Sequence, residues 1–147
     1  GIHTAIETAA NVPWDRLERI LAVTDLVMMD IKVMDSERHR AVTGVPNERI
    51  LANARRLSDV GVPLILRTPV VPGVNDDEDS IEAIASFIAE LPGPKSYELL
   101  RFHAMATHKY DSLDMSYEAA TLKPPTTEDM DRLTEVARSR GLEAHHS

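Results

Sequence analysis

Short apolar runs and longer amphipathic stretches alternate along the chain. The apolar runs have the length of β-strands and occupy residues 2–8, 26–32, 62–71, 97–103 and 142–147. Between them, apolar residues recur at helical spacing in residues 13–23, 47–61, 76–93 and 126–141. Strands and helices are therefore expected to alternate from one end of the sequence to the other.

Residues that start and stop helices flank two of these stretches. Asn47 is suited to cap the second helix and Gly61 to end it. Thr126 or Thr127 is suited to cap the last helix, and Gly141 follows it. These signals support the predicted helix boundaries.

The second strand, beginning "LVMM", is continuously apolar. Such strands are typical of parallel sheets covered by helices, because an antiparallel sheet with one wet face alternates strictly. Neither a G-x-G-x-x-G sequence nor a P-loop is present. We therefore predict an α/β fold in which parallel strands form a barrel or partial barrel, with residues 1–147 as a single domain.

Composition narrows the classes of function. The chain has 147 residues, of which 43% are hydrophobic, enough for one globular domain. The net charge of -8 argues against binding to nucleic-acid phosphates. No apolar run approaches the roughly 18 residues that span a bilayer, so no membrane contact and a cytoplasmic location are expected. Small molecules or protein surfaces are the expected partners.

Polar residues follow four successive predicted strands. In parallel barrels and open α/β sheets, functional groups lie at the carboxyl ends of the strands. The residues at those ends are Glu7 and Thr8, Asp30 and Lys32, Arg67, and Arg101 and His103. Their recurrence at one end of the sheet predicts a site there.

Each of these residues also has a structural interpretation. Lys32 can be a solvated surface residue, and His103 a histidine with a purely structural role. Arg67 can simply pair with Asp30 or Glu7. A zinc site is not expected, because the six histidines lack an H-E-x-x-H or equivalent spacing.

Five stretches resemble a known family when taken together and in order. They read "HTAIETA", "LVMMDIKVMDSERHRAVTGVPNERILANARRL", "LILRTPVVPGVNDDEDSI", "LLRFHAMATHKY" and "LKPPTTEDM". They are similar to the C-terminal two-thirds of the glycyl-radical-enzyme activating enzymes, the radical S-adenosylmethionine (SAM) family that includes the pyruvate formate-lyase activating enzyme.

This resemblance implies a fold and an activity. The fold is an incomplete (β/α)6 barrel with a [4Fe-4S] cluster on a C-x-x-x-C-x-x-C loop. The cluster cleaves SAM to a 5'-deoxyadenosyl radical, which abstracts hydrogen from a glycine of a partner glycyl radical enzyme. The chain has no cysteine, and so no thiolate ligand for such a cluster. We therefore expect the sequence to be the C-terminal portion of a longer parent and to be inactive alone, with no catalytic residue of its own.

The resemblance also implies roles for individual residues. Asp30, Lys32, Arg67 and His103 match positions that bind SAM. Glu7, Thr8 and Asp30, with the Met28 carbonyl, match a monovalent-cation site beside the methionine carboxylate. The family has a glycine soon after the acidic-Thr pair where this chain reads "ETAANV", so the turn after the first strand is not predicted.

Two other functions fit the same residues. One is a Schiff-base aldolase in which Lys32 is the nucleophile at a barrel strand end. The other is a non-catalytic module whose acidic surface docks on a glycyl radical enzyme. Which glycyl radical enzyme is the partner does not follow from the sequence.

Overall fold

The structure is a computed structural model that describes residues 1–93, 96–103 and 122–147. Its strands are β1 (Ala5–Thr8), β2 (Leu26–Asp30), β3 (Leu64–Val70), β4 (Ser96–Arg101) and β5 (Glu143–His146). Its helices in these ranges are α1 (Trp14–Leu21), α2 (Ser36–Thr43), α3 (Glu48–Val60), α4 (Glu78–Glu90) and α6 (Thr127–Ser139).

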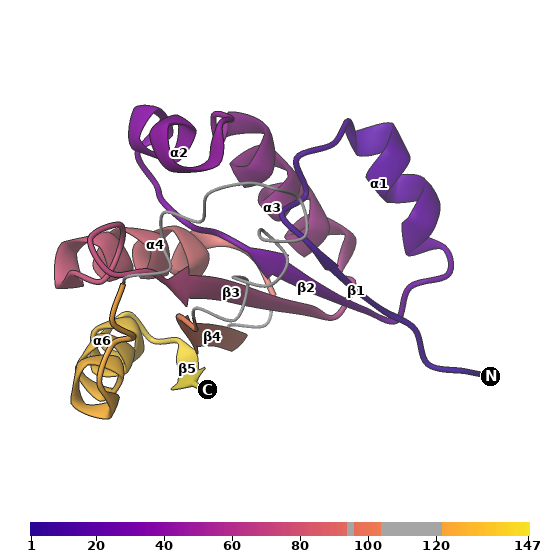
Figure 1. Cartoon of the computed structure of the whole chain (residues 1–147). Helices are drawn as coiled ribbons and strands as arrows, with labels where there is room; N and C mark the ends of the chain where they lie inside the picture. The colour runs from indigo at the N-terminus through magenta and orange to yellow at the C-terminus, as the bar shows by residue number, and fades with distance from the viewer. Residues whose placement is uncertain (94–95, 104–121) are drawn as a thin grey trace.

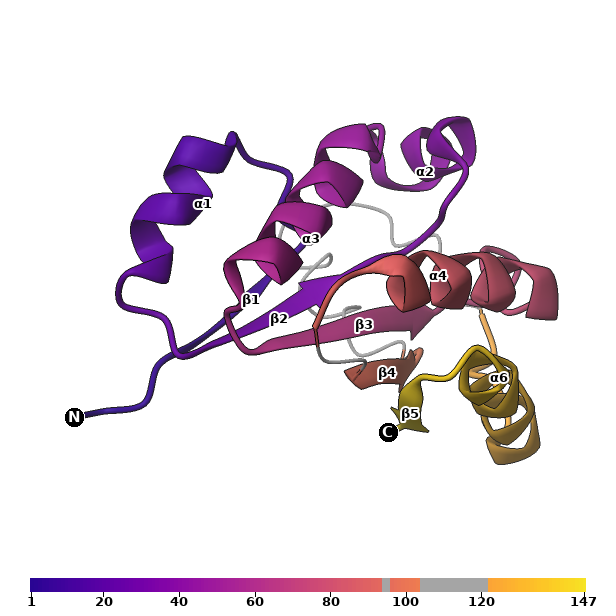
Figure 2. The same cartoon turned by 180° about the vertical axis from the view of Figure 1, so that it is seen from behind.

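All five strands are parallel and lie in one sheet in the order of the sequence, β1-β2-β3-β4-β5. Helices α3 and α4 cover one face of this sheet (Figures 1 and 2). The predicted alternation of helices with parallel strands is therefore confirmed. Within the described ranges, no helix is long and apolar enough to cross a membrane.

The main hydrophobic core lies between the sheet and its helices. Val27 and Met29 of β2 are fully buried in it, together with Leu57 of α3 and Ile84 of α4. Met28, between the two core residues of β2, points to the opposite face and is only partly buried. The apolar run thus buries alternate residues in the core and directs the others toward the second face.

Helix α2 was not predicted. It begins at Asp35, whose side chain accepts a hydrogen bond from the Arg38 amide, and ends at Gly44 with a φ of 82°. Of its own residues only His39 is buried. Because the helix has almost no apolar face, hydrophobic periodicity gave no signal for it.

The predicted helix ends are mostly correct. Gly61 ends α3 in the left-handed conformation, with a φ of 73°. Thr126 caps α6 in a reciprocal capping box with Asp129. Asn47 does precede α3, but its side chain makes no capping bond and instead donates to the carbonyls of an earlier loop. The predicted N-cap position of Asn47 is therefore confirmed, whereas capping by its side chain is not observed.

The turn after β1 has a left-handed backbone without a glycine. Ala10 has a φ of 52° and is almost completely buried. The Ala10 amide donates to the Thr8 hydroxyl at 2.8 Å, and the Asn53 side chain donates to the carbonyls of Ala10 and Val12, each at 2.8 Å. These polar contacts hold a conformation that an L-residue adopts only at a cost.

Replacing Ala10 tests this conformation. Ala10→Val is expected to lower the free energy of unfolding by at least about 2 kcal/mol, because a β-branched residue adds left-handed strain and overpacks a buried site. Ala10→Gly is expected to stay within about 1 kcal/mol of the parent, since relief of strain offsets the entropy lost on folding. Urea denaturation measures both, and equal stability of the two variants would contradict the assigned turn.

Candidate functional site

Four charged side chains, which we call the charge quartet, form a continuous chain of ion pairs: Glu7, Arg67, Asp30 and Lys32. Arg67 Nη2 lies 3.2 Å from Glu7 Oε2 and 3.2 Å from Asp30 Oδ1. Lys32 Nζ lies 3.0 Å from the other oxygen of Asp30, Oδ2. The quartet thus links three neighbouring strands, and its formal charges balance.

Exposure differs along the quartet. The Arg67 side chain is 10% exposed and that of Asp30 20%, whereas Lys32 is 34% and Glu7 64% exposed. Burial disfavours the charge of Arg67, but hydrogen bonds and charges from Glu7 and Asp30 outweigh it and raise the pKa of the guanidinium. The Arg67 hydrogen bond and charge in turn lower the pKa of Glu7. Arg67 is therefore the fixed centre of the quartet.

Strand geometry explains why these residues meet. Asp30 is the last residue of β2, and the sheet register places it directly opposite Arg67 on β3. Arg67 lies in the middle of β3, since that strand continues to Val70. The expectation that Arg67 ends its strand is therefore wrong. Arg67 is nevertheless level with the end of β2, because β3 continues for three residues past that level.

The same row of the sheet continues across two more strands. Arg67 is opposite Glu98 on β4, and Glu98 is opposite His145 on β5. His145 Nε2 lies 3.9 Å from Glu98 Oε1. Glu98 was not predicted as a site residue, because a single acid inside an apolar strand gives no signal until the strand register is known.

The side chains of the residues expected to hold a monovalent cation already contact other groups of the protein. The guanidinium of Arg67 bridges the carboxylates of Glu7 and Asp30. The Thr8 hydroxyl accepts a hydrogen bond from the Ala10 amide, and the Met28 sulfur lies 3.8 Å from Arg67 Nη1. A cation at this position would have to share the two carboxylates with Arg67.

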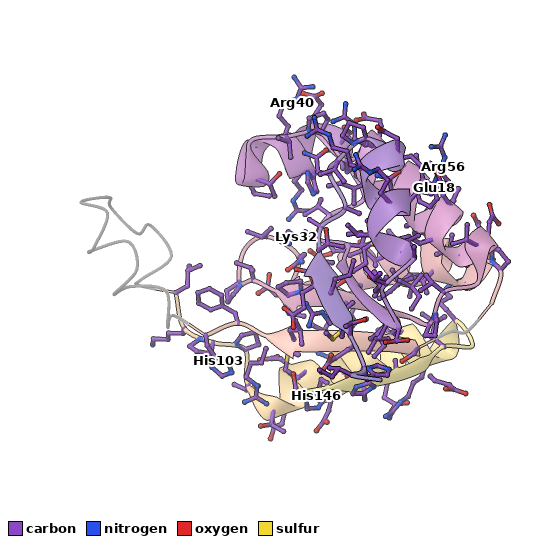
Figure 3. All side chains as sticks on the ribbon, turned by 90° about the vertical axis from the view of Figure 1, so that its right-hand side faces the viewer. Glu18, Lys32, Arg40, Arg56, His103 and His146 are labelled. Carbon is purple, nitrogen blue, oxygen red and sulfur yellow. The ribbon has the colours of Figure 1, made fainter. Side chains whose placement is uncertain are left out.

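His103 is not part of the quartet. It is exposed and lies two residues beyond β4. Lys32 and His103 point toward the same side of the molecule but lie apart (Figure 3). Among the described residues, no hydrogen bond or ion pair joins His103 to Lys32, Asp30 or Arg67, and no group of three metal-binding side chains occurs.

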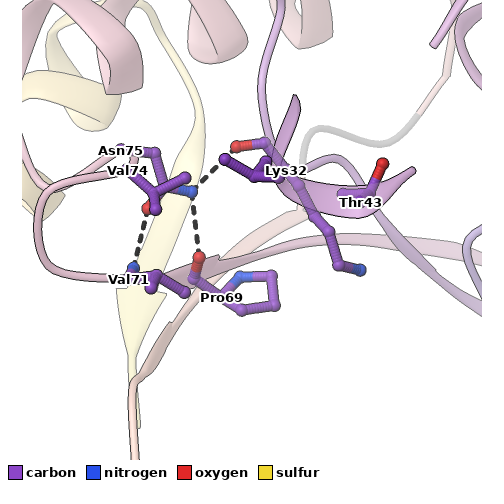
Figure 4. Close-up of a pocket in the computed structure, with 7 residues that line it drawn as sticks. Lys32, Thr43, Pro69, Val71, Val74 and Asn75 are labelled. Atoms are coloured by element: carbon purple, nitrogen blue, oxygen red, sulfur yellow. Dashed lines mark hydrogen bonds between the residues drawn. The ribbon is translucent and has the colours of Figure 1, made fainter. Parts of the chain in front are cut away.

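A small, mostly apolar pocket of about 180 Å³ opens beside Lys32 (Figure 4). Its lining consists of Lys32, Val42, Thr43, Pro69, Val71, Val74 and Asn75. It is comparable to an engineered cavity of roughly 150 Å³ that binds benzene. The pocket therefore has room for one small apolar group next to a lysine.

Comparison with known proteins places this geometry in a family. The sequence model of the Radical SAM superfamily matches residues 1–87, and the chain belongs to that superfamily. It is 38% identical over 132 residues to a pyruvate formate-lyase-activating enzyme of Streptococcus mutans, covering 86% of this chain and 50% of that protein. It is 44% identical over 115 residues to an isethionate sulfite-lyase activating enzyme of Nitratidesulfovibrio vulgaris, covering 77% of this chain and 37% of that protein.

Solved structures agree. A domain of a pyruvate-formate lyase-activating enzyme from Bacteroides vulgatus superposes with a TM-score of 0.81 at 29% identity, covering all of this chain and 82% of that one. A radical SAM methyltransferase from Sphaerobacter thermophilus shares the fold, with a TM-score of 0.71, 20% identity, and coverage of 97% and 39%. The resemblance to activating enzymes and to part of a radical SAM barrel is confirmed. The chain spans half or less of the length of the two curated relatives described above.

The ion pair of Glu7 predicts a pH dependence of stability. Because Arg67 lowers the pKa of Glu7 from its usual 4.5, the stabilising contribution of Glu7 is present above that value and lost as pH falls through the lowered pKa. As the pH is lowered below about 5, the free energy of unfolding is therefore expected to fall less for Glu7→Gln than for the parent. Urea denaturation at a series of pH values measures the difference. Glu18→Gln, at an exposed carboxylate of α1, is the control, and identical curves for parent and Glu7→Gln would refute the pairing.

Proposed function

We propose that this chain is the SAM-binding portion of a radical SAM activating enzyme that generates a glycyl radical on a partner enzyme. The observation that carries the proposal is the charge quartet, which joins three neighbouring parallel strands level with the end of β2, in a chain that belongs to the radical SAM superfamily. The names of its relatives, activating enzymes for pyruvate formate-lyase and isethionate sulfite-lyase, support the same activity.

Lys32 is the residue we assign to the methionyl carboxylate of SAM. Its side chain is the more exposed of the two cationic side chains in the quartet, and its amine makes one ion pair, with Asp30. A carboxylate can replace Asp30 as its partner without leaving Asp30 unpaired, because Arg67 also binds Asp30. An exchange of ion pairs at Lys32 therefore leaves no buried charge unpaired.

The other sequence-derived residues have supporting roles in this proposal. Arg67 and His103 offer hydrogen bonds to the nucleoside part of SAM, with Arg67 also fixing Asp30. Glu7, Thr8, Asp30 and the Met28 carbonyl bind a monovalent cation beside the methionyl carboxylate. Since Arg67 bridges the two carboxylates, cation binding requires that they be shared.

The residues present fit SAM but not an iron-sulfur cluster. The quartet offers cations to a carboxylate and carboxylates to hydroxyl and ammonium groups, which suits an amino acid joined to a nucleoside. When bound in a radical SAM enzyme, SAM supplies the 5'-deoxyadenosyl radical. The chain contains no cysteine to ligate iron, so a [4Fe-4S] cluster belongs to a longer parent protein in this proposal.

The two other functions receive less support. An imine-forming lysine must present a free amine, whereas Lys32 donates to Asp30. Membership of the radical SAM superfamily also favours SAM binding over an aldolase. Docking on a glycyl radical enzyme without chemistry is compatible with this chain as part of a larger enzyme. A single domain in the cytoplasm, without nucleic-acid or membrane partners, completes the proposal.

Substitution of Lys32 tests the cofactor assignment. Lys32→Ala is expected to weaken SAM binding roughly 10- to 100-fold, because a charged hydrogen bond contributes about 1.5–3 kcal/mol. Isothermal titration calorimetry of the chain with SAM measures the dissociation constant. Lys123→Ala is the matched control, since Lys123 is exposed and lies outside the quartet.

Unchanged binding by Lys32→Ala, or an equal loss in Lys123→Ala, would contradict the role of Lys32. Borohydride reduction in the presence of a carbonyl substrate distinguishes a Schiff-base aldolase from a SAM-binding protein. SAM binding predicts no covalent adduct, while an aldolase predicts reduction onto Lys32.

The absence of cysteine gives a second test. Anaerobic treatment with iron and sulfide is expected to leave the 147-residue chain colourless, because it offers no thiolate ligand. Absorbance spectroscopy with iron analysis is the measurement. Stoichiometric iron-sulfur absorbance on this chain would show that other residues ligate the cluster and that the assignment to a longer parent is wrong.

A further inference from the structure

Side chains donate hydrogen bonds to four consecutive backbone carbonyls, those of residues 31–34, around Lys32. The Ile31 carbonyl accepts from the Thr68 hydroxyl at 2.6 Å, the Lys32 carbonyl from Asn75 Nδ2 at 2.8 Å, and the Val33 and Met34 carbonyls from Asn47 Nδ2 at 2.9 and 2.7 Å. All three donor residues are almost fully buried. The segment after β2 is therefore fixed residue by residue, although it has left the sheet.

Asn75 uses its whole amide in this arrangement. Its Nδ2 donates to the Lys32 carbonyl and, at 2.9 Å, to the Pro69 carbonyl, while its Oδ1 accepts from the Val71 amide at 2.7 Å (Figure 4). Asn75 is 1% exposed, so no solvent competes for these bonds. One side chain thus joins the loop after β2 to the loop after β3.

We infer that Asn75 is a positioning residue for Lys32, which sets where the lysine amine lies relative to Asp30 and the pocket. Lys32 and Asn75 both line that pocket, and the Lys32 amine makes its ion pair with Asp30 from a backbone that Asn75 holds. The link to SAM rests on the proposed function, whereas the position of Lys32 does not. Without the amide, the Lys32 and Pro69 carbonyls lose a buried donor, and the two loops can separate.

The chain contains a matched control. Asn53 is also a buried asparagine whose Nδ2 donates to two loop carbonyls, those of Ala10 and Val12. Its loop follows β1 and does not carry Lys32. Replacing either asparagine by alanine removes two hydrogen bonds donated to loop carbonyls, and Asn75→Ala also removes the bond that Oδ1 accepts from the Val71 amide, so both variants are expected to lose stability. Only the replacement of Asn75 is expected to move Lys32.

The position of Lys32 can be measured without any ligand. The chain has four lysines, so reductive ¹³C-methylation gives four lysine dimethylamine signals, and Lys32→Arg identifies that of Lys32. Asn75→Ala is expected to shift the Lys32 signal toward its position in the urea-unfolded chain, and Asn53→Ala to leave it in place. Asn75→Asp and Asn53→Asp, which keep the shape but lose the donor, form a second pair in case an alanine variant does not fold.

Titration with SAM supplies the functional readout. Asn75→Ala is expected to weaken binding roughly tenfold, as losing the residue that orients a ligand does in metal sites. Asn53→Ala is expected to bind as the parent does. A Lys32 signal that stays in place in the Asn75 variants, or moves equally in the Asn53 variants, would overturn the inference whatever SAM does. Failure of the parent to bind SAM would instead contradict the proposed function, and the ligand-free signal would still decide the role of Asn75.

Discussion

The constraint on which the site depends is the need of backbone carbonyls for hydrogen-bond donors once a strand leaves the sheet. Beyond Asp30 the chain turns away from the sheet, and side chains supply the donors for its next four carbonyls. Those donors come from β3, from the loop after it, and from the start of α3. The backbone on either side of Lys32 is therefore set by residues distant in sequence, and the site forms only when β2, β3 and α3 are assembled.

Electrostatic balance is the second constraint on the same place. Arg67 has a nearly buried guanidinium, which is stable there only with acidic partners, and it has two. Because Arg67 holds both Glu7 and Asp30, the Lys32 ion pair is the one that can exchange without exposing an unpaired buried charge. The quartet thus separates a fixed cation from an exchangeable one, a division of roles that residue type alone does not reveal.

The sequence predicted the order of elements, the parallel sheet and the region of the site, because strand length, helical periodicity and strand-end chemistry are local signals. It did not predict α2, which has almost no apolar face, or the turn at Ala10, where polar contacts stabilise a backbone that favours glycine. That Asp30 lies directly opposite Arg67 depends on the register of β2 and β3, which the sequence does not give. The bracing by Asn75 depends on two loops meeting in space, which no window of sequence contains. The sequence thus indicated the four charged residues of the quartet, but neither Glu98 in the same row of the sheet nor the uncharged residues that hold the backbone around Lys32.

The pocket and the charge quartet meet at Lys32, whose backbone carbonyl is bound by Asn75. The amide that binds the Lys32 carbonyl also closes the loop that lines the pocket, and Lys32 itself forms part of the wall. A group that enters the pocket therefore contacts the same residues that determine where the lysine amine lies. A ligand with an apolar part and a nearby carboxylate would satisfy both features at once, and this joint requirement is more selective than either feature alone.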